Sequence, residues 1–238
     1  MPIDTDSGTN LGTINDIVTT LFGESAQTVD IVILLTILTL LPSILIMLTG
    51  FTRILIVLSF VRQALGMQQT PPNQVMIGLA LFLTFFVMQP VFSRVYDEAY
   101  VPFTEGQITQ EVFIEDAMVP IRQFMFEHVF DTDMNFFIEM SGTEVELDAE
   151  GKIIDESIPS SVLIPAFLTS EIKQAFFIGF FIYIPFIVID MIVASTLMSM
   201  GMMMLPPAMI SLPFKVLLFV LVDGWQLIIG ALMRTFYQ

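Results

Sequence analysis

Residues 174–214 read QAFFIGFFIYIPFIVIDMIVASTLMSMGMMMLPPAMISLPF and contain one charged residue, Asp190. Two other long stretches, residues 31–52 and 63–93, carry no charge at all. A helix that spans a membrane needs about 20 consecutive, mostly apolar residues. The sequence therefore predicts four membrane-type helical segments. They lie at about residues 31–49, 75–93, 172–198 and 208–232.

The composition of the whole chain agrees with a membrane protein. Of its 238 residues, 55% are hydrophobic and only 13% are charged, and the mean hydropathy is +0.83. An ordinary soluble domain carries about 25% charged residues. We therefore predict an all-α integral membrane-type protein, built from bent helical hairpins with proline-broken segments.

The charged residues exclude several classes of function. Asp and Glu number 24 against 8 Lys and Arg, which gives a net charge of −16 and excludes nucleic acid as a partner. The chain has no Cys and a single His, His128, and lacks the sequence signatures of zinc, nucleotide and serine-hydrolase sites. We predict no metal, no cofactor and no catalytic residues, and we interpret the acidic pairs such as Asp131/Asp133 as solvated charge.

Basic residues predict the orientation, because short cytoplasmic loops retain Lys and Arg. Arg53 and Arg62 place the connection 50–74 in the cytoplasm. Four predicted parts follow: an extracytoplasmic segment 1–30, a first membrane-type hairpin 31–93, an acidic extracytoplasmic helical region 94–170, and a second hairpin 171–238. Within the third part, spacing predicts a helix near residues 114–129, kinked or divided at Pro120, and residues 141–160 are predicted to be a mobile insertion.

Prolines and charges interrupt the apolar segments. Pro42 and Pro185 lie inside them, and broken backbone at membrane depth requires protein or a water-filled cavity around it. The candidates for buried polar side chains are Arg53, Arg62, Asp190 and Asp223. Snorkelling to the interface is the alternative for the two arginines, but the aspartate side chains are too short for it. This pattern predicts segments packed against other protein, including other subunits.

Methionine is concentrated between residues 191 and 209, with three in a row at Met202, Met203 and Met204. Gly201 precedes the triplet and Pro206-Pro207 follows it, which indicates a turn. Met is flexible and apolar, and suits a surface that repacks around different partners. The functional hypothesis is a deformable hydrophobic loop that seals a pore. The alternative is a Met-rich segment of an ordinary hydrophobic core.

Several longer motifs occur in a fixed order along the chain. They are FTRI (51–54), GMQQTPPNQ (66–74), DMIVAS (190–195), GMMMLPP (201–207), LPFK (212–215) and VDGWQ (222–226). With these motifs the chain resembles the FliP family of type III secretion export-gate proteins. The resemblance covers residues 31–98 and 160–236.

The resemblance implies a core pore-forming subunit of the flagellar export gate, which passes unfolded flagellar proteins across the bacterial inner membrane at the basal body. It implies a closed helical pore complex of several copies with FliQ and FliR, in contact with FlhB and FlhA. It also implies roles for particular residues. These are a pore gasket at Met202, Met203 and Met204, an inter-subunit salt bridge between Glu171 and Lys215, and an extracytoplasmic aromatic group for assembly and pore lining at Phe130, Phe136 and Phe137.

Three alternative functions remain open at this point. The first is the equivalent subunit of a virulence injectisome. The second, from a different class, is an ion- or proton-coupled transporter that uses Asp190 and Asp223 as relays. An intramembrane enzyme is the third.

Overall fold

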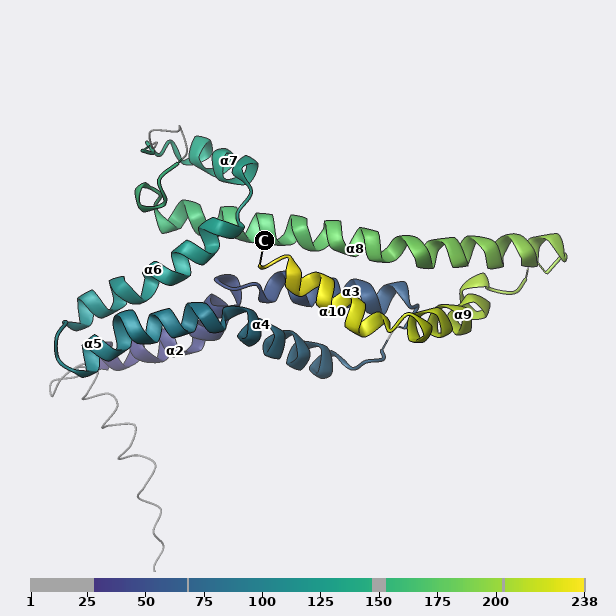
Figure 1. Cartoon of the computed structure of the whole chain (residues 1–238), viewed down its shortest axis with the longest axis horizontal. Helices are drawn as coiled ribbons and strands as arrows, with labels where there is room; N and C mark the ends of the chain where they lie inside the picture. The colour runs from purple at the N-terminus through teal and green to yellow at the C-terminus, as the bar shows by residue number, and fades with distance from the viewer. Residues whose placement is uncertain (1–27, 68, 147–152, 203, 238) are drawn as a thin grey trace, which may run out of the picture. The chain divides into compact units, whose positions relative to one another are not determined.

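The computed structural model describes residues 28–67, 69–146, 153–202 and 204–237. Its elements over these residues are all helical (Figure 1), as the composition predicted. The chain divides into two units between Leu45 and Ile46. In chain order the helices are α2 (Thr28–Met47), α3 (Phe51–Ala64), α4 (Asn73–Val95), η1 (Tyr96–Tyr100), α5 (Val101–Thr104), α6 (Gln110–His128), α7 (Asp131–Ser141), η2 (Asp155–Ser157), α8 (Ser160–Ser199), α9 (Pro207–Leu221) and α10 (Gly224–Arg234). The predicted N-terminal segment 1–30 lies almost entirely outside the described residues.

Two described stretches are long and apolar enough to cross a membrane. One runs through α4, the π-helical η1 and α5 (Asn73–Thr104), and the other is α8. The pair α9 and α10 passes the same test when taken together, although it is bent by 65°. The first predicted segment corresponds to α2, a 20-residue helix with Pro42 inside it.

The helix α8 is longer than the predicted segment 172–198, because it begins at Ser160. At 1.5 Å per residue, its 40 residues extend about 60 Å, roughly twice the thickness of the hydrocarbon core of a bilayer. Pro165 and Pro185 lie within it without ending it. Figure 1 shows α8 as one uninterrupted helix.

The helix α3 forms the centre of the packing in the second unit. It lies in the stretch 50–74, which was predicted only as a cytoplasmic connection between membrane segments. Ile54, Val57, Leu58 and Val61 are fully buried, and their spacing is that of one helix face. The helix packs against α4 and α8, so a segment between two apolar runs provides much of the core.

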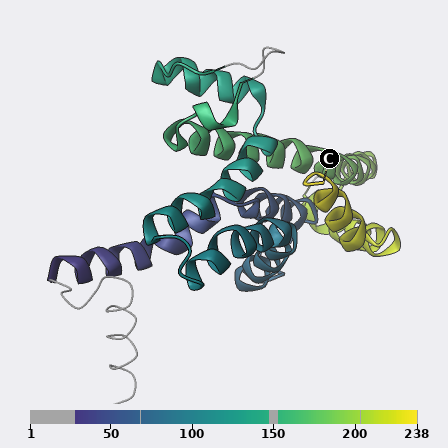
Figure 2. The ribbon, with the colours of Figure 1, turned by 60° about the vertical axis from the view of Figure 1, so that its left-hand side comes forward.

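The acidic region packs onto the N-terminal part of α8. The helix α7 lies along this part of α8, as Figures 1 and 2 show from two directions, and α6 packs between α4 and α8. The helix α6 runs from Gln110 to His128 and is not divided at Pro120. Of the predicted mobile insertion 141–160, residues 147–152 lie outside the described residues.

The end of that insertion is held in place by one arginine. Arg122 of α6 donates hydrogen bonds to the carbonyl oxygens of Ile158 at 2.6 Å and Asp155 at 3.0 Å. It also donates to the hydroxyl of Ser160 at 2.7 Å. Ile158 itself is buried. The described residues just before α8 are therefore packed against α6.

Candidate functional site: the methionine turn and its polar anchors

The turn between α8 and α9, residues 200–206, is here named the methionine turn; Met203 within it lies outside the described residues. The helix α8 ends in a Schellman motif. Gly201 has φ of +73°, its N–H donates to the carbonyl of Met198 at 3.0 Å, and the N–H of Met202 donates to the carbonyl of Leu197 at 2.9 Å. A left-handed residue at this position is usually Gly, because other side chains are strained there. Gly201 therefore determines where α8 stops.

The next helix begins just as definitely. Pro207 is the first residue of α9 and Pro206 precedes it in an extended conformation. Proline has no N–H and suits the first position of a helix, where that group would have no helical partner. Between the two fixed ends, the N–H of Leu205 makes a long 3.4 Å hydrogen bond to the carbonyl of Met202. The two ends of the turn are thus set by Gly201 and by Pro206-Pro207.

The described methionines of this turn are exposed to solvent. Met204 is 98% exposed, Met200 is 64% exposed and Met202 is 43% exposed. These three are therefore not part of the hydrophobic core of this chain. An apolar group of this size at a helix–helix turn is available to contact lipid, another subunit or a passing polypeptide.

A polar anchor joins the two helices that flank the turn. Asp190 of α8 accepts a hydrogen bond from Nζ of Lys215 at 2.6 Å and another from Oγ of Ser211 at 2.5 Å. Ser211 and Lys215 are four residues apart on α9, so both lie on the face toward α8. Lys215 is buried, whereas the Asp190 side chain is partly exposed. Each carboxylate oxygen of Asp190 therefore has a hydrogen-bond partner within the chain.

A second anchor is fully buried at the contact of α3 with α8. Nε of Arg53 donates to Oε2 of Glu171 at 3.0 Å, and Nη2 of the same arginine donates to Oε1 of Glu171. Nη1 of Arg53 donates to the carbonyl and hydroxyl oxygens of Thr235, and the guanidinium lies 4.0 Å from the centre of the Phe236 ring. The pair therefore fastens the C-terminal segment after α10 onto the core.

Glu171 and Lys215, which the family resemblance pairs between neighbouring copies, belong to these two anchors. Within the chain, Glu171 is bonded to Arg53 and Lys215 is bonded to Asp190. Each of the two residues thus already has a partner of opposite charge within the chain. The inter-subunit bridge stays a prediction.

The predicted aromatic group lies on and just before α7. Phe130 and Phe136 are exposed, and Phe137 is partly buried and touches Phe136 edge-to-face. The helix is fastened to α8 by Asp133, which accepts a hydrogen bond from Ser170 at 2.8 Å and pairs with Lys173.

Asp133 is 3% exposed, so interpreting it as solvated charge was wrong. The residue is buried because α7 packs against α8. Its partners Ser170 and Lys173 lie 37 and 40 residues further along the chain, so the local sequence gave no signal for this contact. Ser170 and Thr235 were missed for the same reason, since each gains its role from a residue far away in the chain.

The remaining polar candidates lie nearer the surface. Arg62 donates to Oδ1 of Asn73 at 2.5 Å. Asp223 is exposed in this chain and has φ of +51° in the turn between α9 and α10. It is therefore a short acidic side chain that faces outward at the bend of that helix pair.

The only His of the chain is partly buried at the end of α6. Its Nδ1 lies 2.8 Å from the carbonyl oxygen of Phe124, and its Nε2 lies 3.3 Å from that of Phe236. Burial lowers the pKa of His128 below its ordinary value of 6.5, the hydrogen bond with Phe124 opposes this, and the Arg53 charge adds to it. The neutral form of the ring is thus favoured. Phe236 packs against this ring.

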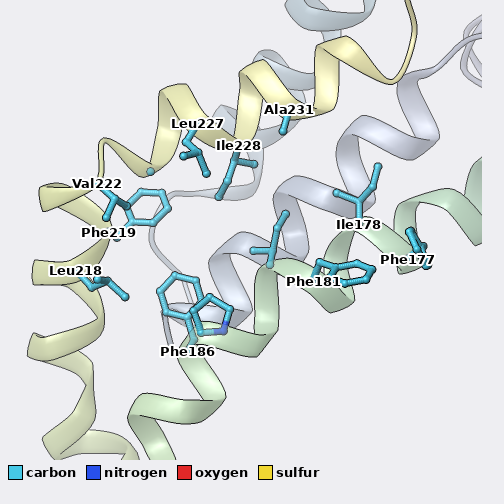
Figure 3. A pocket seen from close by; sticks show the side chains of 13 residues that line it. Phe177, Ile178, Phe181, Phe186, Leu218, Phe219, Val222, Leu227, Ile228 and Ala231 are labelled. Atoms are coloured by element: carbon cyan, nitrogen blue, oxygen red, sulfur yellow. The ribbon is translucent and has the colours of Figure 1, made fainter. Parts of the chain in front are cut away.

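An apolar groove of about 570 Å³ lies between α8 and the α9–α10 pair. Figure 3 shows its lining side chains entering the space between these helices. Its residues are Phe177, Ile178, Phe181, Ile182, Pro185, Phe186, Leu218, Phe219, Val222, Gly224, Leu227, Ile228 and Ala231. No group of three or more acidic or histidine side chains within the described part of the chain could hold a metal ion.

Comparison with known proteins identifies the family. A model of the FliP family matches residues 34–232. The flagellar biosynthetic protein FliP of Pectobacterium carotovorum subsp. carotovorum is 56% identical over 210 residues, which cover 88% of this chain and 79% of that protein. The protein of the same name in Bacillus subtilis (strain 168) is 52% identical over 211 residues, covering 89% of this chain and 93% of the relative. The chain belongs to the FliP family.

Proposed function

We propose that the chain is a core pore-forming subunit of the flagellar type III secretion export gate and passes unfolded flagellar proteins across the inner membrane. The match of the FliP family model over residues 34–232 carries the proposal. Its relatives are named flagellar biosynthetic proteins, which favours a flagellar system over a virulence injectisome or a small-solute transporter. The function is transport and not catalysis.

The proposed partners are further copies of the chain together with FliQ, FliR, FlhB and FlhA. The exposed apolar surface of α8 and of the α9–α10 pair supports an assembly, because large apolar faces are covered by protein or lipid. Native mass spectrometry of the complex, co-expressed with its genomic neighbours and extracted in mild detergent, tests this. A discrete complex with several copies of this chain supports the proposal, and a monomer that transports small solutes alone contradicts it.

The methionine turn is the proposed gasket of the pore, formed by Met202, Met203 and Met204. Exposed, flexible thioether side chains from several copies can meet at an axis and adapt to a closed or occupied pore. Deleting Met202–Met204 is expected to raise the leakage of small ions through membranes while export persists in part. An unchanged conductance barrier in that deletion contradicts the gasket.

The proposed orientation places residues 94–170 outside the inner membrane, with Phe130, Phe136 and Phe137 serving assembly and pore lining there. Because the chain has no Cys, a single introduced Cys is its only thiol. In intact spheroplasts, a membrane-impermeant maleimide should label Glu144→Cys in the acidic region. It should label Gln69→Cys, between α3 and α4, only after the membrane is opened. The reverse pattern contradicts the orientation.

A further inference from the structure

Few residues of α7 are buried. Within this helix only Asp133 and Met134 are buried, and Phe137 and Ile138 pack partly against the core. The helix is 11 residues long, and helices shorter than about 12–15 residues are marginal in water by themselves. The orientation of α7 therefore depends on its contacts with α8.

A polar cluster at the start of α7, here named the α7 cluster, joins this helix to α8. The hydroxyl of Ser170 accepts a hydrogen bond from the N–H of Phe130 at 3.0 Å and donates one to Oδ2 of Asp133 at 2.8 Å. Lys173, also on α8, pairs with Oδ1 of Asp133. Hydrogen bonds require a narrow range of angles, whereas apolar contacts have no preferred direction. The α7 cluster therefore fixes how α7 is turned about its own axis.

The rotation of α7 decides which aromatic ring faces outward. Successive residues on a helix point about 100° apart, so the adjacent Phe136 and Phe137 do not both face α8. With Asp133 bound to α8, Phe137 is partly buried against the core and Phe136 is 55% exposed. Turning α7 by one residue position would exchange the two rings.

We propose that Asp133 and Ser170 are positioning residues for the aromatic group, because they hold α7 in the rotation that presents Phe136 outward. Loss of the Asp133 carboxylate leaves Lys173 and the Ser170 hydroxyl without their shared acceptor, so α7 is no longer held in this rotation. What Phe136 contacts there, a neighbouring chain of the export gate, rests on the proposed function. The hold on α7 does not depend on that function.

The first experiment measures the hold on α7 in the detergent-solubilised chain, without any assembly. Hydrogen exchange with mass spectrometry compares the backbone amides of residues 131–141 in Asp133→Asn and Asp131→Asn. The second variant is the matched control, since it makes the same chemical change in the same first turn at an exposed side chain. Asp133→Asn should speed this exchange on the order of tenfold, because the acceptor of two hydrogen bonds loses its charge. Equal exchange in the two variants overturns the proposal.

The second experiment measures the presentation of Phe136 in the assembled complex. The photoreactive analogue p-benzoylphenylalanine replaces Phe136, and illumination cross-links it to a chain that it contacts. With Asp133→Asn, the cross-linked fraction per assembled complex should fall to about half or less of its value with Asp131→Asn, because supporting contacts set the position of a side chain. A purely structural role of Asp133 lowers the number of complexes and leaves the fraction per complex unchanged, and that result overturns the proposal.

The variant Ser170→Ala tests the α7 cluster independently. It keeps the ion pair of Asp133 with Lys173 and removes only the hydroxyl between Phe130 and Asp133. It should change the exchange and the cross-linked fraction in the same direction as Asp133→Asn. An absence of change in both measurements contradicts the role of Ser170.

The two measurements also separate two kinds of failure. If Phe136 cross-links to no neighbouring chain even with Asp131→Asn, but Asp133→Asn speeds exchange, the assembly role of the aromatic group fails and the hold on α7 stands. If cross-links form and neither measurement responds to Asp133→Asn, the positioning role is wrong and the assembly role stands.

Discussion

Arg53 joins parts of the core that lie far apart in the chain. Its guanidinium is bonded to Glu171 of α8 and to Thr235 after α10, and it stacks on Phe236. A buried ion pair of this kind is weak evidence for stability in itself, because both charges lose their hydration. Removal of one partner is different, since the other charge is then left buried without compensation.

Replacing Arg53 with Met should therefore lower the free energy of unfolding by about 3–5 kcal/mol. Arg94 is exposed and pairs with Glu98 one turn further along the chain. Replacing it should lower the free energy of unfolding by at most about 1 kcal/mol. The measurement is thermal unfolding of the detergent-solubilised protein. Adding Glu171→Gln to Arg53→Met should recover part of the loss. If the Arg53→Met variant alone is as stable as the wild type, the buried pairing of Arg53 with Glu171 is contradicted.

His128 makes the stability of the folded protein depend on pH. Because burial lowers its pKa in the folded state, the folded protein binds this proton less readily than the unfolded chain does. Its contribution to stability is present above about pH 6.5, the ordinary pKa of His, and is lost as the pH falls below that value toward the folded pKa. His128→Gln should remove this component, because the chain has no other His.

The measurement compares the unfolding temperatures of the wild type and His128→Gln at pH 7.5 and 5.5. The two proteins differ only at position 128, so the difference between their pH responses isolates His128. The wild type should lose more stability than the variant on acidification. A larger loss in the variant would contradict a lowered pKa of His128 in the folded protein.

At the scale of the elements, the close approach of α3 and α8 depends on a small residue. Gly179 of α8 faces the ring of Phe60 on α3, and a Cβ at this position would overlap that ring. Phe60 also contacts Phe176 edge-to-face at 5.2 Å. The ring therefore fills the space that a side chain at position 179 would need.

Gly179→Ala is expected to destabilise the protein by about 1–3 kcal/mol, because extra atoms in a packed core force neighbouring groups to shift. Gly78→Ala in α4 is the matched control, since nothing lies within 4 Å of a Cβ there. That control should be neutral or slightly stabilising, as Ala favours a helix over Gly. Thermal unfolding of both variants measures the difference, and equal effects would argue against the close approach.

In the molecule as a whole, Glu171 and Lys215 have two alternative sets of partners. The chain pairs Arg53 with Glu171 and Asp190 with Lys215, whereas the family resemblance implies a bridge between Glu171 and Lys215 of neighbouring copies. An assembly can use the second arrangement only if its interface compensates Arg53 and Asp190 as well. The two arrangements predict different charge-swap rescues.

Glu171→Lys and Lys215→Glu should each reduce the yield of assembled complex, and the double swap should restore part of it if the two residues pair between copies. Asp190→Lys with Lys215→Asp should show rescue if the pairing within the chain persists in the assembly. Native mass spectrometry of the complexes measures both. Absence of rescue in the first double swap would count against direct pairing of Glu171 with Lys215.

Local sequence signals predicted a large part of this fold. Apolar runs identified the membrane-length helices, because hydrophobic length is a property of consecutive residues. Gly201 and Pro206-Pro207 predicted the methionine turn, since a left-handed residue and missing N–H groups act on the adjacent backbone. The 65° bend that separates α9 from α10 was not predicted, although the Asp223-Gly224 pair at this bend is typical of turns.

The all-α membrane class and the position of the methionine turn follow from local sequence, because both depend on neighbouring residues. The partners of the polar side chains depend instead on how the helices pack. Arg53 and Glu171 are 118 residues apart in the chain, and Asp133 becomes buried only where α7 meets α8. The physical reason is that desolvation of a charge depends on everything packed around it, which no local pattern contains.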